Sequence, residues 1–318
     1  MQKIVLFGEC MLELRQGGEG NIMHRSFAGD VFNTAVYLKR AFFEHQVSFM
    51  SGVGHDVISQ ELAANCQAEG LQTSLLRRSA SHNPGIYLVQ TDEHGERSFL
   101  YWRENSAARQ MMKLLDDDIR NTVCKADLFF FSGISLAILA PEDRATFWQF
   151  LSELQEAGVT IAFDPNYRAR LWQSEDDARH QFSLAFAASA IVLPGIEDFA
   201  TLYGHQTLED VVAFCAPFNI KELIIKNGPS SVFCKTEYCH FSLPVEPVKN
   251  VVDTTSAGDS FNGVYLGARQ AGYDIKLAVE LAAKAAGLVI QFPGAIVPNE
   301  NFSELIRAQL LAFEHQAS

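Results

Sequence analysis

The sequence predicts a layered α/β protein built around a mostly parallel β-sheet, and three observations support this fold class. Short apolar runs suited to buried strands recur along the chain and are separated by stretches with helical spacing. With 48% hydrophobic residues, the 318-residue chain can bury a large core without dividing into several domains. Neither an internal repeat nor a Pro/Gly/Ser-rich linker interrupts it. We therefore expect a single domain over residues 1–318 with a small appendage.

The expected core strands are short apolar runs bounded by polar residues, as in strands that are buried on both faces. They are Ile4–Phe7, Val47–Met50, Leu128–Phe131, Thr160–Phe163, Ile191–Leu193 and Leu223–Ile225. Gly8 and Glu9 end the first run, unlike the apolar segment of a secretory signal. The longest apolar stretch, 128–140, is shorter than the roughly 20 residues that span a bilayer. No membrane segment is expected.

A different pattern marks the appendage. Gly85–Gln90 and Glu96–Trp102 alternate between polar and apolar residues on either side of a polar turn at Thr91–Gly95, which is typical of a β-hairpin. Met11–Arg15 alternates in the same way and does not fit a parallel core strand. We place these segments in a small β-sheet beside the main sheet, inserted from approximately 11–28 and 83–105.

The last part of the chain is expected to be helical. Ala257–Ala271 and Ile275–Gln291 have helical apolar spacing and many alanines, and Gly272 separates them. Two neighbouring helices are therefore expected after the last core strand.

The composition excludes several functions. Lys and Arg number 25 against 38 Asp and Glu, and the net charge of -13 opposes binding to nucleic acid or to anionic membranes. None of the six cysteines forms a C-x-x-C pair, so they are expected to be reduced thiols of a cytoplasmic protein. The sequence has no complete dinucleotide-binding fingerprint, no G-x-x-x-x-G-K-[ST] loop and no metal-ligand spacing of histidines.

The most informative stretch is 251–262, where a turn of small residues leads directly into a helix. The unpaired backbone N–H groups of Ser256, Ala257, Gly258 and Asp259, together with the helix dipole, suit an anion such as a phosphate. The Asp259 carboxylate at the same helix start can take a proton from a hydroxyl that attacks phosphorus. Simple helix capping by Asp253 and its neighbours explains these residues equally well when they are taken alone.

A family resemblance decides between these interpretations. Asp253-Thr-Thr-Ser-Ala-Gly-Asp259 resembles the D-T-x-G/A-A-G-D signature of the ribokinase-like, or PfkB, carbohydrate kinases. Gly29-Asp-Val-Phe-Asn33 is similar to the family's N-terminal sugar-binding motif. The resemblance implies a three-layer α/β/α domain with a β-sheet lid, ATP and Mg²⁺ as cofactors, and Asp259 as the general base.

The same resemblance implies that Gly29, Asp30 and Asn33 bind the substrate. Glycine allows the backbone to approach a ligand closely, and Asp30 and Asn33 supply side chains that can bind hydroxyls at a helix N-terminus. A plain helix cap remains the alternative for Asp30.

Within the family, the chain is most similar to the kinases of 2-keto-3-deoxygluconate, through Gly8-Glu9, Phe99–Arg103 and Asp164–Arg168. This implies phosphorylation of the 6-hydroxyl to give 2-keto-3-deoxy-6-phosphogluconate. Arg103 and Arg168 are expected to bind the carboxylate of the sugar acid by charge-assisted hydrogen bonds. The alternative for Arg168 is a position near the transferred phosphate.

Two tyrosines of the small sheet complete the expected substrate site. The resemblance implies that Tyr87 and Tyr101 contact the sugar acid and exclude water. Sheet packing is the alternative for Tyr87.

For the nucleotide, the resemblance implies Asn227, Gly228, Ala257, Gly258 and the Gly294 loop. Lys226 is a weaker candidate for nucleotide binding than these residues, because a lysine at a strand end is usually solvated. The family's N-x-x-E motif, whose Glu organises the water shell of Mg²⁺, is replaced here by Gly195-Ile-Glu-Asp198. Asp198, or else Glu197, is expected to take its place.

Two other functions stay open. A kinase of a neutral sugar such as fructose or ribose is the nearest alternative, and a non-catalytic sensor with the same fold is a more distant one, against which the intact Asp259 argues. The edges and aromatic residues of the small sheet, including Tyr101 and Trp102, indicate a homo-oligomer formed through that sheet.

Overall fold

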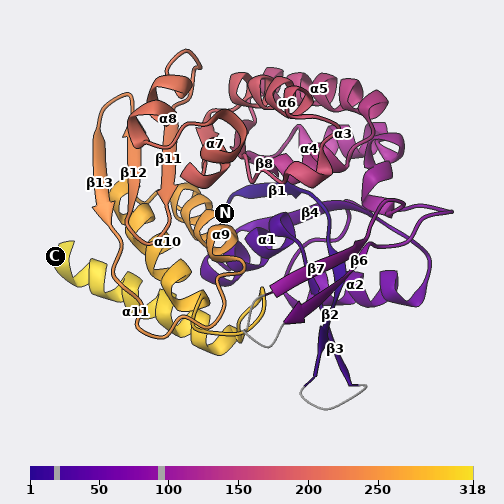
Figure 1. Cartoon of the computed structure of the whole chain (residues 1–318), viewed down its shortest axis with the longest axis horizontal. Helices are drawn as coiled ribbons and strands as arrows, with labels where there is room; N and C mark the ends of the chain where they lie inside the picture. The colour runs from indigo at the N-terminus through magenta and orange to yellow at the C-terminus, as the bar shows by residue number, and fades with distance from the viewer. Residues whose placement is uncertain (18–21, 92–96, 318) are drawn as a thin grey trace.

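The computed structural model describes residues 1–17, 22–91 and 97–317, which form a layer of strands between two layers of helices (Figure 1). In these residues the main sheet has nine strands in the order β13-β12-β11-β10-β9-β8-β1-β4-β5. The strands from β11 to β5 pair in parallel, whereas β12 and β13 are antiparallel and form one edge. The predicted α/β class with a mostly parallel sheet is confirmed.

The six predicted core strands are all present and three further strands join them. The bounds are β1 (Lys3–Phe7), β4 (Gln46–Val53), β5 (Leu76–Arg78), β8 (Leu128–Ser132), β9 (Thr160–Asp164), β10 (Ile191–Val192), β11 (Glu222–Asn227), β12 (Ser231–Thr236) and β13 (His240–Pro244). The sequence did not indicate β5, β12 and β13, because β5 contains two arginines and β13 is not fully buried at any position. A continuous apolar run identifies only strands that are covered on both faces.

One face of the main sheet is covered by the first two and the last three helices. They are α1 (Asp30–Ala41), α2 (Val57–Ala68), α9 (Ala257–Gln270), α10 (Ile275–Val289) and α11 (Asn299–Ala317). Their apolar side chains pack with those of Ile4, Leu6 and Phe130 from the sheet. The two helices predicted near the C-terminus are α9 and α10.

The other face is covered by the helices from the middle of the chain. They are η1 (Ala107–Leu114), α3 (Asp117–Val123), α4 (Gly133–Ile138), α5 (Pro141–Glu156), η2 (Ala169–Leu171), α6 (Glu175–Ala188), α7 (Ile196–Tyr203) and α8 (Leu208–Cys215). The core on this side is rich in phenylalanine, with Phe131 contacting the rings of Phe147 and Phe163. Among the described helices, none combines the length and the apolarity needed to cross a bilayer.

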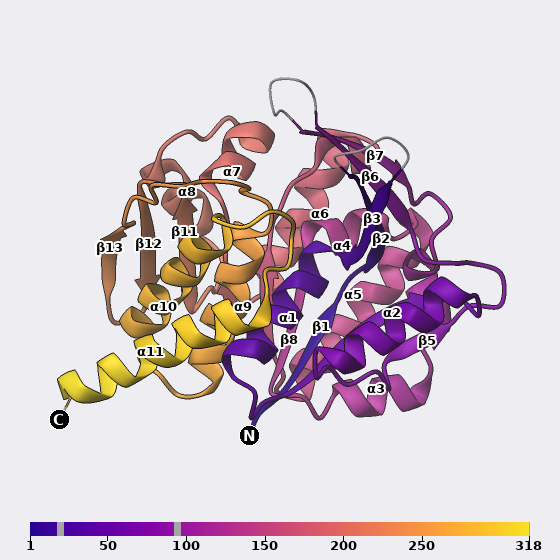
Figure 2. The same ribbon diagram turned by 90° about the horizontal axis from the view of Figure 1, so that it is seen from below.

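A separate small sheet has the order β3-β2-β6-β7 in the described residues. Its strands are β2 (Met11–Gln16), β3 (Met23–Ala28), β6 (Ile86–Thr91) and β7 (Arg97–Trp102). Both views show it on the side of the molecule away from β13 (Figures 1 and 2). The second predicted sheet is therefore confirmed, whereas most of the turn predicted at Thr91–Gly95 lies outside the described residues.

Helices α1 and α9 both begin at the edge of the main sheet where the parallel strands end. Helix α9 packs closely on α1, and a Cβ atom at Gly263 would lie only 2.4 Å from the Thr34 carbonyl oxygen. Glycine is therefore required at this crossing. The close contact brings the first turn of α9 beside the first turn of α1.

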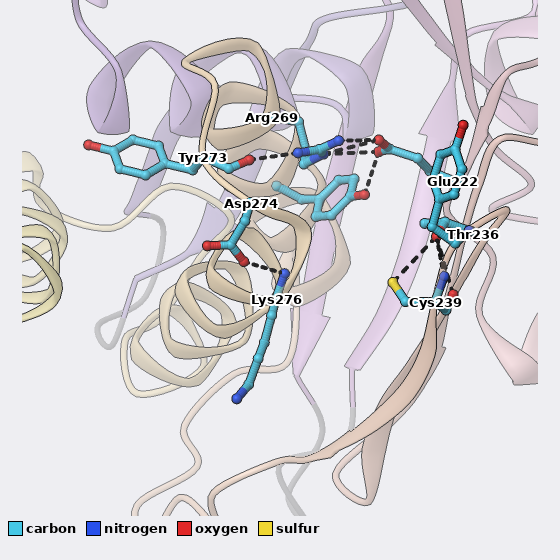
Figure 3. Close-up of polar contacts among 9 residues, drawn as sticks. Glu222, Thr236, Cys239, Arg269, Tyr273, Asp274 and Lys276 are labelled. Carbon is cyan, nitrogen blue, oxygen red and sulfur yellow. Dashed lines mark hydrogen bonds and ion pairs between the residues drawn. The ribbon is translucent and has the colours of Figure 1, made fainter. Parts of the chain in front are cut away.

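The opposite end of α9 is held by a polar cluster (Figure 3). Arg269, in the last turn of α9, forms an ion pair with Glu222 at the start of β11, with 2.6 Å between Nη2 and Oε1. Tyr265 donates a hydrogen bond to Glu222 Oε2 (2.6 Å), and Arg269 Nη1 donates to the Tyr273 carbonyl oxygen (2.6 Å). These contacts fix α9 against β11 at the end remote from the carboxyl edge of the sheet.

Candidate active site

Asp259 lies in the first turn of α9 and accepts a hydrogen bond at Oδ2 from Asn33 Nδ2 of α1 (2.9 Å). Burial, and after it the neighbouring carboxylate of Asp30, raises the pKa of Asp259 to about 7, while the hydrogen bond from Asn33 opposes the shift. A carboxyl group with a pKa near neutrality is suited to act as a general base.

The turn before α9 has a specific backbone geometry. Ser256 adopts a left-handed conformation with φ 65°, which few residues other than glycine occupy readily. Asp253 accepts hydrogen bonds from the backbone N–H of Thr255 (3.0 Å) and of Gly294 (2.6 Å). The turn is thus tied to the loop that contains Gly294, where φ is +90°.

The N-terminus of α9 can receive an anion. The helix begins at Ala257, so the amides of Gly258 and Asp259 lie outside its own hydrogen-bond ladder. The Ala257 amide differs from the expectation, because it donates to the Thr254 carbonyl oxygen at 3.3 Å. The helix dipole adds partial positive charge at this end.

The Gly29 motif lies next to Asp259. A Cβ atom at Gly29 would lie 2.1 Å from the Glu9 carbonyl oxygen, so only glycine allows this approach to the segment after β1. The N-cap of α1 is Gly29 and has no side-chain cap, whereas Asp30 accepts a hydrogen bond from Asn166 Nδ2 (2.9 Å). Asp30 therefore faces the segment after β9 instead of capping its own helix.

Lys226 is held in a buried polar network. Its Nζ atom lies 3.2 Å from Asp164 Oδ2 and 3.1 Å from Asn262 Oδ1, and Asn262 Nδ2 donates to Asp164 Oδ2 at 2.7 Å. Its side chain is only 17% exposed, so the expectation of a solvated lysine does not hold. Nζ also lies 3.7 Å from the Cβ position of Gly258, which brings a positive charge to the start of α9.

Asp198 is the inward-facing member of the expected metal pair, since Glu197 is exposed. Asp198 accepts hydrogen bonds from the amides of Tyr167 (2.8 Å) and Gly195 (3.3 Å). Burial and the Asp164 carboxylate raise the pKa of Asp198, and Lys226 opposes the shift. These carboxylates form a concentration of negative charge beside the helix start.

The donor set fits Mg²⁺ that is held mainly by phosphates and water. In the described part of the chain, no three His, Cys, Asp or Glu side chains come together to bind a metal ion by themselves. Asp164 Oδ1 is buried without a hydrogen-bond partner, and Asp198 lies close by. Such oxygens can accept hydrogen bonds from metal-bound water.

The small sheet presents stacked aromatic rings to the main domain. Tyr87 and Tyr101 stack with 5.5 Å between ring centres and belong to an apolar cluster that includes Ala295 and Ile296 from the Gly294 loop. The Tyr87 hydroxyl donates to Glu13, and its side chain is buried. Tyr87 therefore packs within the sheet, as its alternative interpretation expected.

The structure does not bring Arg103 and Arg168 to a common partner. Arg103 is buried and forms an ion pair with Glu9. Arg168 is half exposed, donates to the Tyr167 carbonyl oxygen (2.9 Å) and lies 4.0 Å from Asp198 Oδ1. The orientation of Arg168 favours its alternative interpretation, on the side of the transferred phosphate.

The remaining nucleotide candidates lie at two places. Asn227 ends β11, and its carbonyl oxygen accepts a hydrogen bond from Ser230 N (3.0 Å), which closes a tight turn with Gly228 at φ +51°. Gly294 lies in the loop after α10, close to Arg15 of β2. Asp253 links this loop to the turn before α9, because its carboxylate accepts a hydrogen bond from the Gly294 amide.

Several residues of the site were assigned no role from the sequence. Glu9, Asp164, Asn166 and Asn262 pair with expected site residues, and the Arg170 guanidinium lies 4.0 Å from the ring centre of Tyr101. Glu9 and Asp164 stand at or just after the end of an apolar strand, a signal that could have found them. Nothing in the local pattern distinguishes Arg170 from a surface arginine.

Comparisons with known proteins are consistent with this geometry. Residues 1–301 match the family described as pfkB family carbohydrate kinase. The 2-dehydro-3-deoxygluconokinase of Haemophilus influenzae is 37% identical over 96% of this chain and 98% of its own length, and that of Dickeya dadantii is 36% identical over 94% and 98%. A Klebsiella pneumoniae fructokinase is 28% identical over 81% of each chain.

Solved structures agree on the fold. An Escherichia coli protein described as a ribokinase II, in complex with ATP and Mg²⁺, superposes with a TM-score of 0.84. The match covers 98% of this chain and all of that one at 21% identity.

Proposed function

The chain belongs to the pfkB family of carbohydrate kinases, and we propose that it transfers the γ-phosphoryl group of ATP to the 6-hydroxyl of 2-dehydro-3-deoxygluconate, also called 2-keto-3-deoxygluconate. The product is 2-keto-3-deoxy-6-phosphogluconate. The observation that carries the reaction type is the partly buried Asp259 carboxyl, with its raised pKa, at the start of α9. The substrate rests on relatives that are 36–37% identical over almost the whole chain.

Asp259 acts as the general base. It accepts the proton of the 6-hydroxyl as that oxygen bonds to phosphorus, while the bond from phosphorus to the ADP oxygen breaks. The amides of Gly258 and Asp259 and the ammonium group of Lys226 stabilise the negative charge on the transferred group. The hydrogen bond from Asn33 fixes the orientation of the carboxylate.

The sugar lies against the start of α1. Gly29 brings the start of this helix against the segment after β1, and Asp30 and Asn33 bind the hydroxyls of the sugar from beside Asp259. Tyr101, which stacks on the buried Tyr87, covers the sugar from the small sheet and excludes water from the reaction. Arg168 provides positive charge beside Asp198, whereas the charge of Arg103 is paired with Glu9.

ATP occupies the region beyond the start of α9. Asn227 and Gly228 at the end of β11, Ala257 and Gly258, and the Gly294 loop line its binding site. Mg²⁺ bound with the phosphates would neutralise their charge, and Asp198 would accept hydrogen bonds from its water shell. The buried, unpaired Asp164 Oδ1 supports this assignment.

The alternatives have less support. A kinase of a neutral sugar is represented by the more distant fructokinase, and it would not require the arginines Arg103 and Arg170 at the small sheet. A non-catalytic sensor would have no need for a carboxyl group held at a raised pKa beside an anion site.

We also propose that the protein is cytoplasmic and forms a homo-oligomer through the small sheet. In the described structure the six cysteines are free thiols. Several apolar side chains of this sheet or next to it are exposed, namely Ile22, Met23, Leu100 and Trp102. Sedimentation of the wild type and of Trp102→Lys tests the interface, because the charge would dissociate an assembly formed there.

The test of the proposed function is ATP-dependent phosphorylation of 2-keto-3-deoxygluconate, fructose, ribose and gluconate by the wild type and by Asp259→Asn. Selective turnover of the keto acid that collapses in the variant is expected. Turnover of only a neutral sugar would retain the kinase and reject the substrate. Absence of turnover with all four acceptors would favour the sensor.

A further inference from the structure

The loop that contains Gly294 is held from the protein core by a tyrosine. Tyr37 of α1 is fully buried, and its hydroxyl donates a hydrogen bond to the Ala295 carbonyl oxygen (2.8 Å). The same hydroxyl oxygen accepts a hydrogen bond from the Val297 amide (3.1 Å). Burial raises the pKa of Tyr37, so the hydroxyl stays protonated and can make both bonds. One side-chain oxygen therefore satisfies two backbone groups of this loop.

The position of Tyr37 in α1 connects the loop to the general base. Residues four apart lie on the same face of a helix, so Tyr37 lies one turn beyond Asn33, which donates to Asp259 Oδ2 at 2.9 Å. Nearly one turn further along, Arg40 donates from Nη1 to the Val297 carbonyl oxygen (2.6 Å). The same helix thus holds the base near its start and the loop nearer its end.

The contacts form a closed circuit between α1, the loop and α9. From the loop, the Gly294 amide donates to Asp253 Oδ2 (2.6 Å), in the turn that leads into α9. Helix α9 carries Asp259, and the hydrogen bond from Asn33 returns from there to α1, where Tyr37 lies. Because every link is a short polar contact, the circuit fixes the separation between the loop and the base.

The loop would lose this position without the Tyr37 hydroxyl. Ala295 and Val297 are both buried, so the carbonyl oxygen and the amide that bond to Tyr37 would be left without a partner. An unsatisfied buried polar group is costly, and the backbone is expected to shift to regain one. A displacement of about 1 Å at a site that works by positioning is enough to weaken phosphoryl transfer.

From this arrangement we propose that Tyr37 is a positioning residue for the nucleotide. By holding the Gly294 loop, Tyr37 fixes the place of ATP relative to Asp259, and it acts through the loop rather than by contact with the reacting atoms. The inference rests on the proposed function, which assigns this loop to the ATP site, and it deepens that function by naming the side chain that supports the loop.

The test is Tyr37→Phe, which removes one oxygen atom and keeps the aromatic ring in the core. The Kd for Mg²⁺ and a non-hydrolysable ATP analogue, measured by titration calorimetry without the acceptor, is expected to rise about 10-fold. The KM for ATP should rise by a similar factor. The KM for 2-keto-3-deoxygluconate should stay within about twofold, because Asp30 and Asn33 keep their contacts at the start of α1.

The matched control is Tyr265→Phe. Tyr265 is also a fully buried tyrosine, and its hydroxyl donates to Glu222 Oε2 (2.6 Å) at the end of α9 remote from the site. This variant loses the same atom and should also lose stability, but its nucleotide affinity and both KM values should stay within about twofold of the wild type.

Arg40→Lys provides a second variant at the loop. It keeps a positive charge beside Glu69 but loses the planar fork that reaches the Val297 carbonyl oxygen. The Kd for the nucleotide analogue should rise about threefold or more. If Tyr37→Phe does not fold, this variant decides, and an unchanged nucleotide affinity in it would overturn the inference.

Three results with folded Tyr37→Phe would also overturn the inference. They are an unchanged nucleotide affinity, an equal loss of affinity for both substrates, and an equal loss of nucleotide affinity in Tyr265→Phe, each of which would leave Tyr37 a purely structural residue. If the wild type binds no ATP analogue or does not phosphorylate 2-keto-3-deoxygluconate, the proposed function fails. That result is visible in the wild type alone, so the two failures are distinguishable.

Discussion

The two ends of helix α9 face the two ends of strand β11, but their charges are arranged in opposite ways. At the far end, Arg269 is neutralised by Glu222, which also accepts a hydrogen bond from Tyr265. At the near end, Asp259 lies among the carboxylates of Asp30 and Asp164 and has a raised pKa. The paired charges at the far end stabilise the fold, whereas the like charges at the near end destabilise it.

This difference shows which end carries the chemistry. A pair of opposite charges that satisfies its hydrogen bonds holds α9 in register with β11. Like charges gathered around one anion site are costly in the unliganded protein, and they become useful when a proton must be accepted or a metal ion bound. The anchored end supplies the rigidity with which the other end holds Asp259.

The largest expected effect comes from Asp259→Asn. Loss of the general base should lower kcat by about 10²- to 10⁴-fold. The free energy of unfolding at pH 8 should be unchanged or higher by about 1–2 kcal/mol, because a partly buried charge is removed while Asn can keep the contact with Asn33. Steady-state kinetics and urea unfolding measure the two quantities.

The pH dependence of this variant sharpens the test. The folded-state pKa of Asp259 is raised, so its carboxyl is ionised in the unfolded chain at pH values where it is still protonated in the folded protein. Its ionisation therefore destabilises the wild type progressively as the pH rises from about 4 to about 7. The stability difference between variant and wild type should grow over this range, and a difference that shrinks would contradict the account.

Lys226→Met is expected to have the next largest effect. It removes the ammonium group beside Gly258 and leaves Asp164 without its cation, so kcat/KM should fall about 10- to 100-fold. The free energy of unfolding should fall by about 1–3 kcal/mol. Lys221→Met, at an exposed position just before β11, is the matched control. Normal kinetics in Lys226→Met would remove this residue from phosphate binding.

Glu222→Gln tests the anchored end. Arg269 would lose its anion while remaining largely buried, and the free energy of unfolding should fall by about 1–3 kcal/mol. Both kcat and KM should stay within about twofold of the wild type at a temperature where the variant is folded. A change in kcat without a change in stability would break the distinction between the two ends.

Ser256→Gly should give the smallest effect. Glycine adopts the left-handed conformation without strain, so stability should change by no more than about 1 kcal/mol. The Oγ atom of Ser256 is buried and has no hydrogen-bond partner in the described structure, so its loss should leave the rising limb of the pH–rate profile in place. A rising limb that moves to higher pH would show that the hydroxyl acts on the carboxyl group of Asp259.

The sequence predicted the features that depend on local patterns. The strand at Ile4–Phe7 is an uninterrupted apolar run because it is covered on both faces, and the turn at 253–259 carries its own signature. The edge strand β13 escaped prediction because its side chains are exposed or only partly buried, which leaves no continuous run to detect.

What the sequence could not predict depends on contacts between distant segments. Lys226 is buried because Asp164 lies two strands away in the sheet, although the two residues are 62 positions apart in the chain. Arg103 is neutralised by Glu9, 94 positions away. Neither partner can be chosen before the strand order is known, and Arg170 resembles a surface arginine until the small sheet is placed above it.

The most direct test of the account is the pH dependence of kcat/KM for 2-keto-3-deoxygluconate between pH 5 and 9. Because the base must be deprotonated, the account predicts a rate that rises with pH, bends at an apparent pKa of about 7 and is constant above it, with this limb absent in Asp259→Asn. A flat profile in the wild type, or the same limb in the variant, would show that Asp259 is not the base.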